Sequence, residues 1–323
     1  MQIQIRHLLE YRYSSPARLE PHTLRLRPRC DGIQTLLAFD LQVDPPPVGS
    51  SALVDLEGNA TELVWFGDPT EHLRIETQAT VLTLRQNPFD YLLLDWATHL
   101  PIDYPSALAV QLQPYLTPQG EATVQTLAWE LWDQVHGNST AFLHHLNQHI
   151  YSECRYILRE KGDPWPAGLT WHRKTGSCRD LTLLFMEVCR TVGLAARFVS
   201  GYQVRPEPSP QVSPPELPAE AVEEPKTDPA MSQNPAHHHL HAWAEVYLPG
   251  AGWRGFDPTQ GLAVADQHIA LAASPHPRGA TPISGQWLGR GIHSSMRYSI
   301  ELAASTPAQS QVQPPSSSPL RPT

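Results

Sequence analysis

The first 85 residues alternate between apolar and polar positions with a period of two. The alternation is clearest in residues 37–43 and 73–81. This period places apolar side chains on one face of a β-strand, so the region predicts an antiparallel β domain. A turn at Glu57-Gly58-Asn59 separates the apolar runs 52–54 and 63–66, and this arrangement indicates a β-hairpin.

The period changes to 3.6 residues in the middle of the chain, as in amphipathic helices. Three segments show it: 124–135, 142–151 and 178–192. Three runs of strand character follow the last helix: 196–202, 240–248 and 252–256. Helices followed by antiparallel strands predict an α+β core. We therefore expect a β domain over residues 1–86 and a core of helices packed on an antiparallel sheet over residues 87–304.

Prolines are concentrated in two segments of the chain. The sequence has 33 prolines, about twice the average usage, and many lie in residues 205–237 and 305–323. Few aromatic side chains accompany them, so neither segment can build a packed core. We predict a disordered insertion within the core and a disordered C-terminal tail.

The charge balance and the N-terminus restrict the partners and the location. The chain has 23 Lys+Arg and 32 Asp+Glu, a net charge of −9, and a field of this sign repels phosphate backbones, so nucleic acid is not an expected partner. The N-terminus lacks a basic segment followed by an apolar one, and no apolar run reaches about 18 residues. We expect a cytoplasmic protein with reduced thiols and no membrane contact.

Cys178 stands out among the four cysteines because it begins the third predicted helix. An isolated cysteine at a helix start is most often a small buried hydrophobe. Here, however, the free N–H groups and the positive end of the helix dipole favour a thiolate and could receive an oxyanion. Gly176 would let a substrate backbone approach closely. Cys189 lies on the apolar stripe of the same helix and is predicted to serve packing.

His241 and Asp257 lie on two strands that a short turn connects. Period two puts His241 and Trp243 on one face of the first strand and apolar side chains on the other. If Trp243 lies opposite Asp257, the carboxylate shares the His241 face and can accept a hydrogen bond from the imidazole. A slip of one residue would turn it away. We predict the first register, with Cys178 as nucleophile, His241 as base and Asp257 as orienter.

Three motifs in this order resemble the transglutaminase-like superfamily: Gly176-Ser177-Cys178, His241-Ala242-Trp243-Ala244-Glu245-Val246 and Asp257-Pro258-Thr259. The N-terminal region resembles that of the bacterial branch through Leu24-Arg25-Leu26-Arg27-Pro28. The resemblance implies a papain-like core in which Cys178, His241 and Asp257 form a catalytic triad. It implies cysteine-dependent acyl transfer at amide bonds through a thioester.

The triad leaves several activities open, because water and amines both resolve a thioester. Lysines are few and no oxygen-ligand calcium loop is evident, so we favour a metal-independent peptidase or amidase. Protein-glutamine amine transfer is the runner-up, and a non-catalytic peptide-binding scaffold of the same fold is the remaining alternative. The run His237-His238-His239 suggests a metal site, but no second cluster accompanies it, and we expect no metal or cofactor.

The expected substrate is a peptide or protein. Its side chains could contact Trp171, Tyr202 or Trp243, although tryptophans near a core more often serve packing. The N-terminal β domain shows no chemistry of its own and is a candidate surface for a partner protein.

Overall fold

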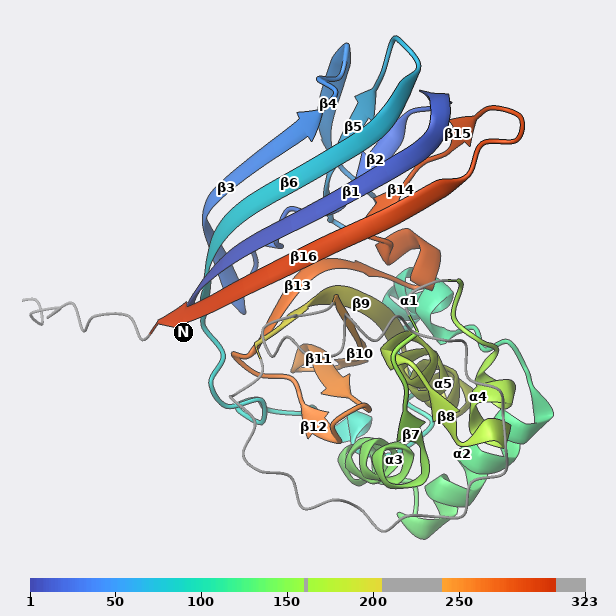
Figure 1. Cartoon of the computed structure of the whole chain (residues 1–323). Coiled ribbons are helices and arrows are strands. Elements are labelled where there is room, and N and C mark those ends of the chain that lie inside the picture. The colour runs from blue at the N-terminus through green and yellow to red at the C-terminus, as the bar shows by residue number, and fades with distance from the viewer. Residues whose placement is uncertain (160–161, 205–239, 306–323) are drawn as a thin grey trace, which may run out of the picture.

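The computed structural model describes residues 1–159, 162–204 and 240–305. Within these ranges the protein has an N-terminal β region beside a core in which helices pack on an antiparallel sheet (Figure 1). The predicted α+β class is therefore confirmed. The Pro-rich segment 205–237 and the tail after residue 305 lie outside the described residues, as does the histidine run 237–239. No helix in the described ranges is long and apolar enough to cross a bilayer.

The β region contains two antiparallel sheets. One contains β1 (Gln2–Leu19), β3 (Gln34–Asp44), β6 (Thr70–Thr83), β15 (Trp287–Leu288) and β16 (Ser294–Ser305). The other contains β2 (His22–Leu24), β4 (Gly49–Val54), β5 (Ala60–Trp65) and β14 (Ile283–Ser284). The predicted hairpin is confirmed, because β4 pairs with β5 and Val54 lies opposite Ala60.

The last strand of the chain completes the first sheet. β16 pairs with β1 from Gln2 opposite Ser305 to Tyr13 opposite Ser294 (Figure 1). The strands over residues 283–305 thus join the β region, whereas the expected division at residue 86 assigns them to the core. Local periodicity could not show this pairing, because the partners lie at opposite ends of the sequence.

The core sheet has the order β12-β11-β10-β9-β13. Its strands are β9 (Ala196–Gln203), β10 (His241–Leu248), β11 (Gly252–Asp257), β12 (Leu262–Ala263) and β13 (His268–Ser274). The α-helices are α1 (Ser106–Leu116), α2 (Ala122–Gln134), α3 (Ser139–Glu153), α4 (Ala167–Arg173) and α5 (Cys178–Thr191). Short elements complete it: η1 (Asp95–Ala97), β7 (Arg155–Tyr156), β8 (Thr175–Gly176) and η3 (Pro277–Ala280). The alternate apolar residues of β10, such as Ala242 and Val246, share one buried cluster with Leu181 and Leu184 of α5.

The end of α5 is fixed to the sheet by a buried guanidinium group. Arg190 donates to Glu187 Oε1 at 3.0 Å and to the carbonyl oxygens of Ala196 and Pro275 at 2.9 and 2.6 Å. Each donor of a buried cation must find an acceptor. These bonds therefore fix the C-terminal end of α5 relative to β9. This attachment sets where the first residue of α5 lies.

Gly201 on β9 lies where two strands approach closely. It pairs with His241 on one side and with Ala270 on the other. A methyl group at Gly201 would lie 2.1 Å from the Ile269 carbonyl oxygen and 2.7 Å from the Trp243 ring. The Ile269 oxygen belongs to the backbone and Trp243 is buried, so glycine permits β13 to pack against β9 here.

We expect Gly201→Ala to lower the free energy of unfolding by about 1–3 kcal/mol, because the added methyl overpacks the sheet. Urea unfolding followed by circular dichroism measures this change. Gly32→Ala is the matched control, since a methyl there meets nothing within 4 Å, and its effect should stay within about 0.5 kcal/mol. A Gly201→Ala protein as stable as the parent would contradict the observed packing.

Candidate active site

The start of α5 is held by the buried carboxylate of Asp180. This group accepts hydrogen bonds from the Ser177 N–H and hydroxyl at 2.8 and 2.7 Å, and from the Trp165 N–H at 2.7 Å. The Arg159 guanidinium donates to it as well, at 2.5 Å. The loop before the helix is therefore fixed, and Cys178 occupies the first helical position, as predicted. Its N–H belongs to the first turn, whose donors have no intrahelical acceptor.

His241 opens β10, and its imidazole meets the carboxylate of Asp257 at the end of β11. The Nε2–Oδ2 distance is 2.7 Å, and the two side chains are 5% and 0% exposed. Ala244 pairs with Phe256, so the same register continued by one residue puts Trp243 opposite Asp257. The predicted register is confirmed, and it is what turns the carboxylate toward His241.

The Cys178 thiol lies close enough to the same imidazole to raise its pKa, and both residues line one cleft. Because Nε2 is engaged by Asp257, Nδ1 is the ring nitrogen that remains for the thiol. The structure thus brings together the three residues that the sequence analysis singled out, with His241 between the thiol and the carboxylate. This is the order that a nucleophile, base and orienter require.

Charge interactions oppose burial at both His241 and Asp257. Burial lowers the pKa of His241, but the Asp257 carboxylate and the Cys178 thiol raise it, to about 10. Burial raises the pKa of Asp257, but His241 and His268 outweigh it and hold the pKa well below its usual range. At neutral pH the pair is therefore an imidazolium and a carboxylate. An imidazolium beside a cysteine sulfur is the arrangement that activates thiol nucleophiles.

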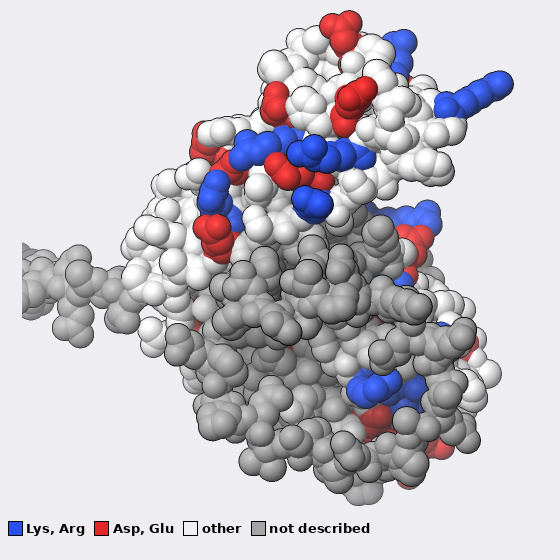
Figure 2. Space-filling model, in the orientation of Figure 1, with Lys and Arg blue, Asp and Glu red and all other residues white. Residues whose placement is uncertain are grey.

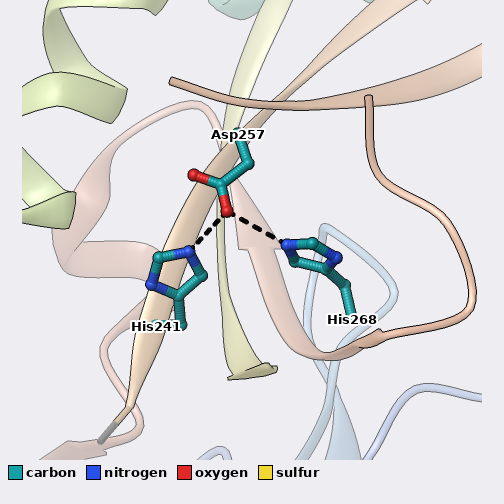
Figure 3. Close-up of side chains that lie close together, drawn as sticks. All are labelled: His241, Asp257 and His268. Carbon is teal, nitrogen blue, oxygen red and sulfur yellow. Dashed lines mark hydrogen bonds and ion pairs between the residues drawn. The ribbon is translucent and has the colours of Figure 1, made fainter. Parts of the chain in front are cut away.

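The sequence analysis missed His268, a second histidine on the same carboxylate. Figure 3 shows the imidazoles of His241 and His268 converging on one oxygen of Asp257, and the His268 Nε2–Oδ2 distance is 3.1 Å. Thr259 donates its N–H and hydroxyl to the other oxygen at 3.0 and 2.6 Å. A single polar residue at the start of the apolar run 268–274 was the available signal, but nothing local linked it to Asp257.

The other predicted contact residues have packing roles in the structure. Trp243 is buried, with its ring centroid 5.1 Å from that of His268, so it packs against the histidines that bond Asp257. Trp171 packs on His149 and lies outside the cleft that contains Cys178. At Gly176 an added methyl would lie 2.8 Å from the Cβ of Asp180, so glycine gives room to the carboxylate that anchors α5. Tyr202 is buried and hydrogen-bonded to His7.

A cleft of about 610 Å³ contains both Cys178 and His241. One side of it comes from the core, through the start of α5, residues 159 and 162–164, and residues 277–282. The other side comes from the β region, through His7 and Tyr11 on β1 and Tyr298 on β16. The candidate site thus lies between the two parts of the molecule.

The trio of His241, Asp257 and His268 also has donor atoms within 4.8 Å of one another. Two imidazoles and a carboxylate are a donor set that Zn²⁺ accepts. In the structure, however, both Nε2 atoms point at one carboxylate oxygen. A metal ion would have to replace both of these hydrogen bonds, so metal binding and the triad exclude one another.

Two family models match the chain. Residues 3–82 match the bacterial transglutaminase-like N-terminal region, and residues 129–258 match the transglutaminase-like superfamily. The chain has a transglutaminase-like core behind a bacterial transglutaminase-like N-terminal region. The resemblance stated from the motifs is confirmed.

Relatives of this transglutaminase-like chain extend over nearly its whole length. An uncharacterized protein of Mycobacterium leprae is 23% identical over 297 residues, 90% of this chain and 94% of that one. One from Mycobacterium tuberculosis is 24% identical over 317 residues, 93% of this chain and 91% of the relative. A proposed cysteine protease from Cytophaga hutchinsonii has a crystal structure that matches with a TM-score of 0.65 at 19% identity, covering 95% and 92% of the two chains. This similarity shows a shared fold for both parts.

In this transglutaminase-like core, Asp257→Asn should lower the pKa of His241 by several units, because burial then acts without the opposing carboxylate. At pH 8 the ring should be protonated in the parent and neutral in the variant. An NMR titration of the imidazole resonances measures this, with assignment through His241→Asn. Asp44→Asn, at an exposed pair with His72, is the control. An unchanged titration of His241 would contradict the account of its charge state.

His268→Phe should lower the free energy of unfolding by about 1–3 kcal/mol, because Asp257 remains buried with one donor fewer. His268→Gln can keep an N–H near the carboxylate and should recover most of this loss. Urea unfolding of both variants at pH 7 gives the comparison. Equal stability of the two would show that the hydrogen bond to Asp257 contributes nothing.

Proposed function

We propose that the protein is a cysteine-dependent enzyme that transfers acyl groups at the amide bonds of a peptide or protein, and that water is the acceptor. One observation carries the proposal: a buried imidazole bonds the Asp257 carboxylate and lies beside the Cys178 thiol, in a cleft large enough for a peptide. The protein then acts as a peptidase or amidase.

The first half of the reaction forms a thioester. The sulfur of Cys178 attacks the amide carbonyl carbon, and the carbonyl electron pair moves onto oxygen. The N–H of Cys178 at the first turn of α5 is placed to receive this oxyanion. When the oxyanion collapses, the C–N bond breaks and His241 gives its proton to the departing nitrogen. An amine leaves, and the acyl group stays on sulfur.

The second half returns the enzyme to its starting state. His241, now neutral, takes a proton from water as the oxygen attacks the thioester carbonyl. The new tetrahedral centre collapses, the C–S bond breaks, and a carboxylic acid leaves. Asp257 keeps the ring oriented and stabilises its charged form in both halves. A primary amine in place of water would yield a new amide by the same steps.

The reactivity of Cys178 toward iodoacetamide tests the mechanism. At pH 7 we expect Cys178 to be alkylated faster than Cys30, although Cys30 is exposed and Cys178 is buried. His241→Ala should slow alkylation of Cys178 by about 10²-fold, because the imidazolium that stabilises the thiolate is lost. Peptide mass spectrometry resolves the four cysteines, and Cys178→Ala identifies the labelled peptide. Similar rates at Cys178 and Cys30 in the parent protein would refute the triad.

A peptide library incubated with and without a primary amine then identifies the acceptor. Hydrolysis products that do not depend on the amine, and that Cys178→Ala abolishes, support the proposal. Amide products that require the amine would replace it with amine transfer.

A further inference from the structure

The wall of the cleft that comes from the β region is built by the first and last strands of the chain. In the register of β1 and β16, Leu9 lies opposite Tyr298 and Tyr11 opposite Met296, and all four residues line the cleft. They form an apolar and aromatic surface within the cleft that contains Cys178.

Within the ranges that the structure describes, the three arginines that line the cleft already have hydrogen-bond acceptors. Arg159 donates to Asp180, Arg179 donates to the carbonyl oxygen of Gly162, and Arg278 pairs with Asp163. The outer face of the β region is no different: Figure 2 shows basic and acidic side chains side by side there. The guanidinium groups that the structure describes in the cleft are thus engaged within the protein, and its apolar wall suits the uncharged parts of a ligand.

His7, unlike these arginines, lines the cleft with a polar atom that has no hydrogen-bond partner among the described residues. Its side chain is fully buried in the lining of the cleft, and its Nδ1 lies 2.9 Å from the hydroxyl of Tyr202. Its Nε2 is shielded from solvent and has no hydrogen-bond partner among the residues that the structure describes. Buried polar atoms are nearly always paired, so an unpaired one in a cleft indicates a group that a ligand would satisfy.

The neighbours of His7 decide where its proton lies. Burial lowers the pKa of His7 to about 4, so the ring is neutral at pH 7 and has one N–H. Burial raises the pKa of Tyr202, so its phenol keeps a proton that it can donate to His7 Nδ1. Tyr202 then donates its own proton to His7 Nδ1. The ring proton is left at Nε2, which is therefore a donor.

We propose that the Nε2–H of His7 binds a backbone carbonyl of the acyl-donor peptide, whose bulky apolar or aromatic side chains lie against the β1–β16 wall. The inference rests on the proposed function and adds its substrate class. It also assigns the β region a direct part in substrate binding.

Inactivation by acetyl-Phe-Phe-Ala chloromethyl ketone, which alkylates a reactive cysteine after binding as a peptide, tests the inference. His7→Phe should lower its second-order rate constant roughly tenfold, the usual effect of removing one partner of a buried hydrogen bond. The rate of Cys178 alkylation by iodoacetamide should stay within about twofold, since this reagent is too small to contact His7.

His22→Phe is the matched control. His22 is also buried in the β region, bonds the Glu20 carbonyl oxygen and lies outside the cleft, so both rates should remain unchanged. Tyr202→Phe is a second variant with a smaller perturbation. It keeps the His7 ring but lets its proton move to Nδ1, and the peptidyl rate should fall several-fold.

Modified probes test the same bond without relying on a variant that may misfold. An alkene isostere replaces each peptide bond of the inhibitor in turn and removes its carbonyl and its N–H, whereas N-methylation removes the N–H alone. At one position the isostere should slow inactivation of the parent protein roughly tenfold and have no further effect on His7→Phe. N-methylation at that position should not depend on His7.

Several results would overturn the inference alone, with Cys178 still alkylated selectively by iodoacetamide. These are a peptidyl rate that His7→Phe leaves unchanged, a parallel fall in both rates, or coupling of His7 to the N–H instead of the carbonyl. Loss of selective alkylation in the parent protein would instead overturn the proposed function, and this inference with it.

Discussion

The buried carboxylate of Asp257 is the constraint on which the site depends. A buried charge is tolerated only when its lone pairs are hydrogen-bonded. Thr259 supplies both donors to Oδ1, while His241 and His268 donate to Oδ2, with Gln203 at 3.5 Å. These donors come from β9, β10, β13 and the turn after β11. Any slip between those strands would leave the charge unpaired, so the sheet register and the geometry of the triad stabilise one another.

The parts of the site that the sequence predicted are those with local signals. A helix start marks Cys178, and period two with a short turn fixes which face of β10 and β11 carries His241 and Asp257. A tight hairpin allows few registers, and burial of the apolar face on α5 selects one of them. The period-two pattern and the turn residues were therefore enough to predict the register of β10 with β11 and the β4–β5 hairpin of the β region.

The parts that the sequence did not predict depend on contacts between distant segments. β13 follows β11 and β12 in the chain, yet it pairs with β9 on the far side of the sheet, and only this order brings His268 to Asp257. Motif position does not show what surrounds Gly176 and Trp171. Their neighbours, Asp180 and His149, became evident only in three dimensions.

The return of β16 to β1 has the same non-local character and a larger consequence. By pairing with β1 along twelve positions, the last strand fixes the sheet whose inner face reaches the cleft. Tyr202 on β9 and His7 on β1 then share a hydrogen bond that joins the β region to the core. Tyr202 lies next to Gln203, which contacts Asp257. The same strand of the core sheet therefore contacts both His7 in the cleft wall and the carboxylate that bonds His241, which connects the β region to the triad.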